Sequence, residues 1–194
     1  MPKARLEAFT DGVIAVIITI MVLEMKVPHG ADLASLAPLW PVFLAYLLSY
    51  VYVGIYWNNH HHLMHAVRQV NGSILWATLH LLFWLSLIPF VTGWVSENHF
   101  ASLPVAAYGV VLMFSGFAFV LLTRCLVTIH GRDSEIARWI RGDRKGKISV
   151  AIYAIAIPLA FVQWWVAFAL YVFVAAIWFI PDSRIERHAQ GRPT

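Results

Sequence analysis

The sequence predicts an all-α integral membrane protein with six membrane-spanning helices, from its composition and from the length of its apolar segments. Of its 194 residues, 60% are apolar and only 12% are charged, and the mean hydropathy is +0.71. Soluble proteins contain about 45–50% apolar and about 25% charged residues. The apolar residues gather in segments of about 20, the length that an α-helix needs to cross a bilayer. These features exclude a disordered chain, a nucleic-acid-binding domain and almost any soluble enzyme.

Six segments reach this length or come close to it, and helix-breaking residues separate them. The expected spans are 8–27, 39–63, 73–95, 105–129, 148–162 and 164–180. Pro28, Gly72 and Pro104 stand in the breaks, as expected for residues that end helices or form turns. Pro89 and Pro158 lie inside spans, where neighbouring helices can satisfy the freed carbonyl groups.

The last two segments are short, and together they cover the 33 residues of 148–180. That length is too great for one straight crossing at about 1.5 Å per residue. Gln163 lies between the segments and precedes Trp164 and Trp165, as at a membrane interface. We therefore expect two helices here. No internal repeat and no second domain is visible, so a single domain is expected over 1–194.

Basic residues predict the orientation of the chain in the membrane. Of the 14 Lys and Arg residues, only Lys26 falls on one side of the six-span plan. The other side holds Lys3, Arg5, Arg68, Arg124, Arg132, Arg138, Arg141, Arg144, Lys145, Lys147, Arg184, Arg187 and Arg192. Because cytoplasmic loops are rich in Lys and Arg, we expect both termini in the cytoplasm and the protein in the cell membrane.

The basic pI of about 9.4 then reflects contact with the inner leaflet, and no nucleic-acid partner is expected. Within the long cytoplasmic loop, residues 134–141 fit either a short interfacial helix or a solvated linker.

The first span has a charged residue near each end and an uncharged face between them. Asp11 lies near the cytoplasmic end and Glu24 near the outer end. On a wheel of about 100° per residue, one face spans about 80° and has Ile20 beside it. This face holds Val16, Thr19, Leu23 and Val27. Periodicity alone favours an ordinary packed helix in which Asp11 caps a neighbouring group or pairs with an arginine.

Two motifs give a resemblance to a known family. Residues 5–13 read R-L-E-A-F-T-D-G-V, and Ala15, Ile18 and Thr19 follow. This segment resembles the signature R-x-x-x-F-S-D-G-V-x-A-x-x-I-T of the transmembrane protein 175 family, which comprises the lysosomal potassium channel and shorter bacterial and archaeal relatives. The second span contains W-N-N-H-H at 57–61, similar to the W-x-x-H-H of that family. Thr10 replaces the usual serine and keeps its hydroxyl group.

The resemblance implies a homotetramer with a central pore that the first span of each chain lines. It implies passive, potassium-selective or potassium-preferring conduction, with potassium ions and the lipid bilayer as partners. By position it assigns Val16, Ile20 and Leu23 to layers of apolar side chains that narrow the pore, and Thr19 to a hydroxyl ring linked to selectivity. The chain contains no T-V-G-Y-G, so a carbonyl-ring filter of that type is not expected.

The resemblance gives the remaining motif residues a structural role. They would tie the first helix to neighbouring helices, because a buried charge needs partners. Direct coordination of ions by these residues is the less favoured alternative. The residues of this network are Arg5, Phe9, Thr10, Asp11, Trp57, Asn58, His60 and His61.

A histidine cluster near the cytoplasmic end of the second span gives an alternative function. It comprises His60, His61, His62 and His65. The pairs His61/His65 and His62/His65 have i,i+4 and i,i+3 spacing, so each pair could share a metal ion. No carboxylate or cysteine lies nearby in sequence to complete a site, and we expect no metal or other cofactor. The alternative is a metal- or haem-binding membrane redox protein that uses this cluster, with His80 facing it as a second ligand in the case of haem.

Two further classes are disfavoured. A coupled transporter usually needs ionisable residues at mid-membrane, whereas the middle of these spans is nearly free of charge. An enzyme is not expected, since no nucleophile–base pair or convergent pair of carboxylates can be assembled from the motifs. Cys125 is the single cysteine, which excludes an intrachain disulfide.

Overall fold

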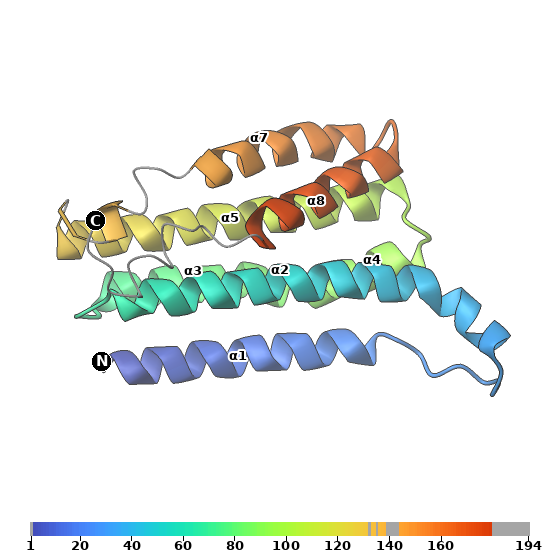
Figure 1. Cartoon of the computed structure of the whole chain (residues 1–194), viewed down its shortest axis with the longest axis horizontal. Helices are drawn as coiled ribbons and strands as arrows, with labels where there is room; N and C mark the ends of the chain where they lie inside the picture. The colour runs from blue at the N-terminus through green and yellow to red at the C-terminus, as the bar shows by residue number, and fades with distance from the viewer. Residues whose placement is uncertain (1, 132, 135, 139–143, 180–194) are drawn as a thin grey trace, which may run out of the picture.

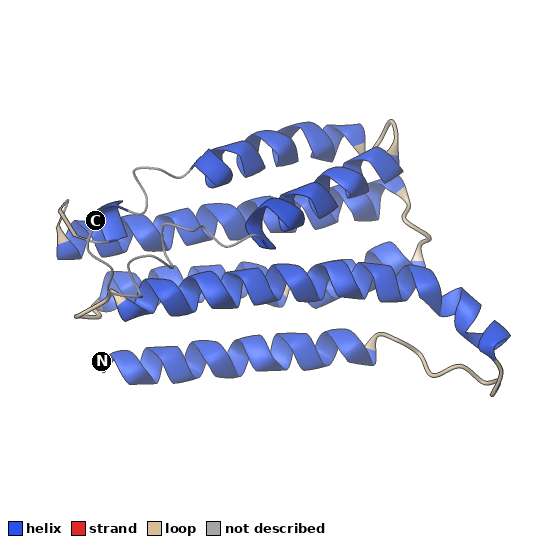
Figure 2. Cartoon of the chain, in the orientation of Figure 1, coloured by secondary structure: helices blue, strands red, loops and turns tan. Residues whose placement is uncertain are grey.

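The chain forms an all-helical bundle in the computed structural model, which describes residues 2–131, 133, 134, 136–138 and 144–179 (Figure 2). The long helices run alternately in opposite directions along one axis (Figure 1). The elements are α1 (Lys3–Leu23), a 3-10 helix η1 (Leu33–Leu39), α2 (Trp40–His65), α3 (Gly72–Ser86), α4 (Ile88–Glu97), α5 (Ser102–His130), α7 (Arg144–Leu159) and α8 (Trp164–Phe179). The prediction of an all-α fold is confirmed for the described residues.

Among the described residues, four helical stretches are long and apolar enough to cross a membrane. They are Lys3–Leu23, Leu33–His65, Gly72–Glu97 and Ser102–His130. Helices α7 and α8 have 16 residues each. The chain reverses between them, and they pack side by side rather than forming one long helix (Figure 1).

The structure divides the expected third span at Leu87, between α3 and α4. Pro89 lies in the first turn of α4 and has no N–H, so the backbone hydrogen-bond ladder is interrupted there. Ser86 donates a hydrogen bond to the carbonyl of Phe83 at 2.8 Å, and the ladder resumes with Val91 N to Leu87 O at 3.1 Å. Local side-chain bonds of this kind let a proline-broken helix persist within a membrane.

The other helix ends differ from the expected spans by a few residues. Helix α1 begins at Lys3 and ends at Leu23, so Val27 lies beyond it. The second span is preceded by η1, where Asp32 caps the first turn by accepting from the backbone N–H of Ser35 at 3.0 Å. In the loop after α5, residues 136–138 are helical and Ile136 is buried, whereas 139–141 lie outside the described residues.

Buried hydroxyl groups join helices in the interior of the bundle. Ser49 on α2 places its Oγ 2.7 Å from Thr92 Oγ1 on α4 and 2.9 Å from Tyr108 OH on α5. All three residues are buried. Because lipid offers no hydrophobic drive for helix association, such interhelical hydrogen bonds and close packing hold membrane helices together.

Three tyrosines extend this hydroxyl network to the last helices. Tyr52 OH donates to the carbonyl of Tyr171 at 2.6 Å, and Tyr153 OH donates to Tyr52 OH at 3.2 Å. Tyr171 OH donates to the carbonyl of Val105 at 3.3 Å and lies against Gly109 of α5. The absence of a side chain at Gly109 therefore provides the space that the Tyr171 ring occupies.

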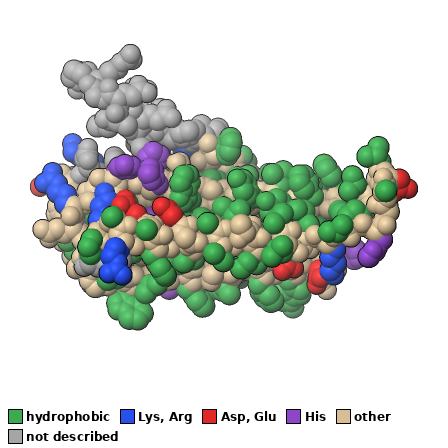
Figure 3. Space-filling model, turned by 90° about the horizontal axis from the view of Figure 1, so that it is seen from below, with side chains coloured by type: hydrophobic (Ala, Val, Ile, Leu, Met, Phe, Trp, Pro, Cys, Tyr) green, Lys and Arg blue, Asp and Glu red, His purple; other side chains and the backbone are tan. Residues whose placement is uncertain are grey.

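The surface has the distribution expected for a membrane protein. Figure 3 shows hydrophobic side chains over the middle of one face, with charged and histidine side chains toward its ends. The large exposed apolar residues include Trp76, Phe90 and Phe173. Such a surface is stable in hydrocarbon, where the helices satisfy their own backbone polar groups.

Candidate functional site

Helix α1 has one face buried in the chain and the opposite face exposed. The buried residues are Leu6, Thr10, Ile14, Ile17 and Met21, and the helix contacts α2, α3 and α4. On the opposite face, the exposed fractions are 54% for Val16, 43% for Ile20 and 78% for Leu23. The residues that the resemblance assigns to a pore therefore lie together on the exposed face of α1, and none of them is buried in the described chain.

Thr19 lies on this exposed face. Its Oγ1 donates a hydrogen bond to the carbonyl of Val16, one turn earlier, at 2.9 Å. Because the hydroxyl hydrogen is used within the helix, the oxygen lone pairs are free to face outward. A row of such oxygens can replace part of the hydration shell of a cation.

An apolar groove runs between the exposed face of α1 and the α3–α4 segment. Phe9, Gly12, Val16 and Ile20 line it from α1, and Phe90 lines it from α4. It is open to the outside of the chain, so an apolar segment of another molecule can lie in it. Two of the residues that the resemblance assigns to the pore, Val16 and Ile20, thus form part of the wall of this groove.

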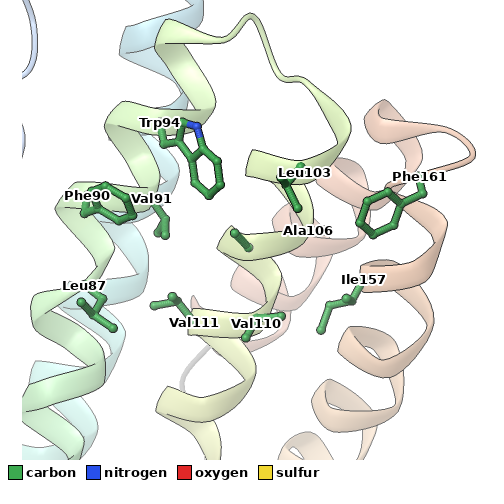
Figure 4. A pocket seen from close by; sticks show the side chains of 11 residues that line it. Leu87, Phe90, Val91, Trp94, Leu103, Ala106, Val110, Val111, Ile157 and Phe161 are labelled. Atoms are coloured by element: carbon green, nitrogen blue, oxygen red, sulfur yellow. The ribbon is translucent and has the colours of Figure 1, made fainter.

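A second crevice lies among α4, α5 and α7 and is also apolar. Figure 4 shows Trp94, Leu103 and Phe161 among the side chains that line it. Its volume is about 480 Å³, and Phe90 lines both this crevice and the α1 groove. Its lining has no acid, base or nucleophile, so it offers no chemistry of its own.

The two sequence motifs meet in one hydrogen bond. Trp57 Nε1 on α2 donates to Asp11 Oδ1 on α1 at 2.9 Å. Hydrogen bonds to charged acceptors are stronger than those between neutral groups. The Asp11 carboxylate thus fixes α1 against α2 near the end of the bundle where the chain begins.

The structure leaves other motif residues without a partner in the described part of the chain. Arg5, Phe9 and Asn58 are exposed, and neither the Arg5 guanidinium nor the Asn58 amide has a hydrogen bond there. Thr10 Oγ1 and His60 Nε2 are buried and have no hydrogen-bond partner in the described residues. A buried polar atom without a partner costs about 1–3 kcal/mol, which indicates that these positions serve more than packing.

The histidines near the end of α2 and His80 on α3 do not come together in one cluster. His61 Nε2 lies 3.0 Å from His65 Nε2, and the Trp57 ring stacks on His61. His80 on α3 instead accepts a hydrogen bond from Trp84 of its own helix at 3.0 Å. Among the described residues, no group of three or more His, Cys, Asp or Glu side chains is arranged to hold a metal ion.

Charged residues at the opposite end of α1 approach α4. Lys26 Nζ lies 3.2 Å from Glu97 Oε1 in an exposed ion pair. The Glu24 carboxylate packs against Gly93, where a Cβ atom would lie 3.0 Å from Glu24 Oε2. This end of the groove is therefore polar, in contrast to its apolar middle.

One polar residue that the sequence reasoning missed organises the loop between α2 and α3. His130 Nε2, at the end of α5, accepts from the backbone N–H groups of Arg68 at 3.1 Å and Gln69 at 3.4 Å. His130 Nδ1 lies 2.9 Å from the carbonyl of Leu126, which it can reach only as a donor. The only signal available in the sequence is a lone histidine in the last turn of a long helix, which has no specific meaning.

Comparisons with known proteins agree with the motifs. The family model described as endosomal/lysosomal potassium channel TMEM175 matches residues 5–89. A curated potassium channel of Chryseobacterium sp. (strain P1-3) is 53% identical over 187 residues, which cover 96% of this chain and 97% of the relative. The human endosomal/lysosomal proton channel TMEM175 is 36% identical over 96 residues, which cover 43% of this chain and 19% of that protein.

A solved structure gives the same result for the fold. The crystal structure of a lysosomal potassium-selective channel TMEM175 homolog from Chamaesiphon minutus superposes with a TM-score of 0.79 at 26% identity. The match covers 92% of this chain and 96% of that one. With its several membrane-spanning helices and its near full-length relative at 53% identity, this chain is a multi-pass membrane protein of the TMEM175 family.

Proposed function

We propose that this protein is a passive potassium channel of the cell membrane. In this proposal four six-span chains form a homotetramer with both termini of each chain in the cytoplasm, and the α1 helices line the central pore. Potassium ions are the permeant species, and no cofactor takes part. The names of the Chryseobacterium relative and of the Chamaesiphon structure support potassium as the permeant ion.

The observation that carries the proposal is the exposed face of α1. A single chain leaves Val16, Thr19 and Ile20 exposed, with none of the three buried among the described residues. Several copies around an axis would enclose this face. Arg5, Phe9 and Asn58 are exposed as well, so they are available for contacts between copies.

The chemistry of this face suits a pore that is narrow and uncharged. A ring of Ile20 or Leu23 side chains offers water no hydrogen bonds, so a narrow collar of this kind empties and blocks ions. When the collar widens, ions pass it, and the outward oxygen of Thr19 compensates part of their lost hydration. The apolar barrier to ions and the oxygen that partly coordinates them then come from neighbouring turns of α1.

The test is an ion-flux assay with the purified protein in liposomes, using potassium, sodium and caesium in turn and a proton gradient as a fourth arm. We expect flux in the order potassium above sodium. Thr19→Val keeps the shape and removes the hydroxyl, so it should lower the potassium-to-sodium ratio. Thr19→Ser keeps the hydroxyl and is the matched control.

The outcomes separate the possibilities. Equal potassium and sodium flux in the parent protein would contradict a preference for potassium. Proton flux alone would indicate a proton channel, which is what the name of the human relative describes. An unchanged potassium-to-sodium ratio in Thr19→Val, with the oligomer intact, would mean that α1 does not determine ion selectivity. The haem version of the redox alternative gains no support, because His80 bonds to Trp84 of its own helix.

A further inference from the structure

We propose that His61 and His65 form a two-histidine binding site for a divalent late transition-metal ion such as Cu²⁺, Ni²⁺ or Zn²⁺. The two residues lie one helical turn apart near the end of α2, and both side chains are exposed. Their Nε2 atoms are 3.0 Å apart, and their ring centroids are 4.5 Å apart at an interplanar angle of 88°. The site is independent of the proposed channel function.

The separation of the two nitrogen atoms fits one shared ion. Imidazole nitrogens bind these metals at about 2.0–2.1 Å. Two such nitrogens are then about 2.9 Å apart when the angle at the metal is 90°, and about 3.4 Å apart when the geometry is tetrahedral. The observed 3.0 Å lies within this interval. To bind a shared ion, the two rings would rotate about their side-chain torsions so that both Nε2 lone pairs face it.

The protons can be accounted for without another reactant. At 3.0 Å in the metal-free protein, one neutral ring donates its Nε2–H to the Nε2 lone pair of the other. When the ion binds, the donating ring carries its proton on Nδ1 instead, and both Nε2 lone pairs face the metal. This exchange of tautomer releases no proton, so the step balances without another reactant.

The surroundings hold one of the two ligands in place. The Trp57 ring stacks on His61 with centroids 5.8 Å apart and an interplanar angle of 23°. Trp57 is itself held by its hydrogen bond to Asp11. Outer contacts that fix a ligating ring increase metal affinity. His61 is thus pre-oriented, and His65 completes the pair from the next turn.

The remaining coordination positions would be filled by water. The described residues contain no group of three metal-binding side chains, so the pair acts without a third protein ligand. Two imidazoles give weaker binding than the three or four ligands of resident zinc sites. The ion therefore binds reversibly, in the order Cu²⁺ above Ni²⁺ and Zn²⁺, and is not a cofactor that the fold requires.

The test is calorimetric titration of the purified full-length protein with NiCl₂ near pH 7.5, after removal of any polyhistidine tag. We expect one ion per chain. His61→Ala and His65→Ala should each weaken binding by roughly tenfold or more, because one of two ligands is lost. His62→Ala is the matched control, since His62 lies in the same turn but outside the 3.0 Å pair, and it should bind as the parent does.

A spectroscopic measurement distinguishes ligation from an indirect effect. Cu²⁺ bound to the parent should show electron paramagnetic resonance splitting from two nitrogen ligands, and His65→Gln should reduce this to one. The glutamine keeps a polar side chain, so it serves as the readout if an alanine variant fails to fold. Unchanged nickel affinity in both alanine variants, or an equal loss in His62→Ala, would overturn the assignment.

Discussion

Helices α1 and α5 have similar apolar sequences but different surroundings. The bundle buries 50% of the most apolar window of α5 and only 28% of that of α1. Helix α5 contacts α3, α4, α7 and α8, whereas α1 contacts α2, α3 and α4 and leaves one face open. Hydropathy thus places both helices in the membrane, and small and hydroxyl side chains decide which of them is enclosed by its own chain.

The contacts that hold the two helices differ in kind. In α5, Gly109 admits the Tyr171 ring and Tyr108 bonds to Ser49, so close packing and buried hydrogen bonds act together. In α1, the hydrogen bond from Trp57 to Asp11 lies near one end, and the open face has apolar side chains and Thr19. A helix held mainly on one side can change its position relative to the bundle more easily than one packed on several sides.

The largest change in stability should come from filling the space at Gly109 of α5. In Gly109→Ala the new methyl group would collide with the hydroxyl and Cζ of Tyr171, a fully buried side chain. We expect the free energy of unfolding to fall by about 1–3 kcal/mol, as for other overpacked cores. Unfolding monitored by tryptophan fluorescence during denaturant titration in detergent measures it.

Gly12→Ala is the control for this change. A Cβ atom at Gly12 of α1 meets nothing within 4 Å in the chain. Alanine also favours helix over glycine by about 1 kcal/mol, so the stability of the chain should stay the same or rise. A loss in Gly12→Ala as large as in Gly109→Ala would mean that the open face of α1 is as closely packed as the interior of α5.

The second effect concerns conduction along the open face of α1. Leu23→Asn puts hydrogen-bonding groups into the proposed apolar collar, which should wet it and raise ion leak. We expect about a tenfold increase, which corresponds to ~1.4 kcal/mol removed from the barrier. Liposome flux measures the leak, and size-exclusion chromatography verifies the oligomer.

Val22→Asn provides the matched comparison. Val22 is 42% exposed and neighbours Leu23 in the sequence, but its side chain points about 100° away around the helix. It should leave the leak close to the parent value. Equal leak in both variants would show that the increase comes from a polar residue anywhere in α1, and the collar would have to be sought elsewhere.

A smaller effect is expected where α1 is attached to α2. Trp57→Phe keeps an aromatic ring beside His61 and removes the N–H that donates to Asp11. Since Trp57 is 42% exposed, we expect a loss of about 1 kcal/mol in the free energy of unfolding. A double-mutant cycle with Asp11→Ala, which removes the acceptor, isolates the pair. A coupling energy near zero would show that the bond contributes nothing to holding α1.

The difference between α1 and α5 also shows what the sequence could predict. Hydropathy placed the fourth span at 105–129, and the structure has α5 at Ser102–His130. The family assignment from two motifs is confirmed by the full-length relative. Both predictions rest on properties that are local in sequence, namely a run of apolar residues and a fixed order of motif residues.

Features that depend on how helices are rotated against one another were not predictable. The meeting of Ser49 with Thr92 and Tyr108 requires three helices in one register, and the spacing within each helix leaves that register open. The division of the third span at Leu87 was not predictable either, because a proline inside a span can kink a helix or break it. The pore roles of Val16, Thr19, Ile20 and Leu23 stay predictions, because they depend on contacts between chains.

The smallest effect should come from the exposed ion pair near the C-terminal ends of α1 and α4. The side chains of Lys26 and Glu97 are 82% and 60% exposed, so water screens their attraction and both chains lose rotamer freedom in pairing. Exposed pairs of this kind contribute about 0–1 kcal/mol, and Lys26→Met should change the free energy of unfolding by less than about 0.5 kcal/mol. The free energy of unfolding of the parent should likewise change little between low and high salt, because water already screens the pair. If Lys26→Met instead lowered stability as much as Trp57→Phe does, the C-terminal end of α1 would be held as firmly as the end at Asp11. Helix α1 would then be fixed at both ends, and any movement relative to it would have to come from the other helices.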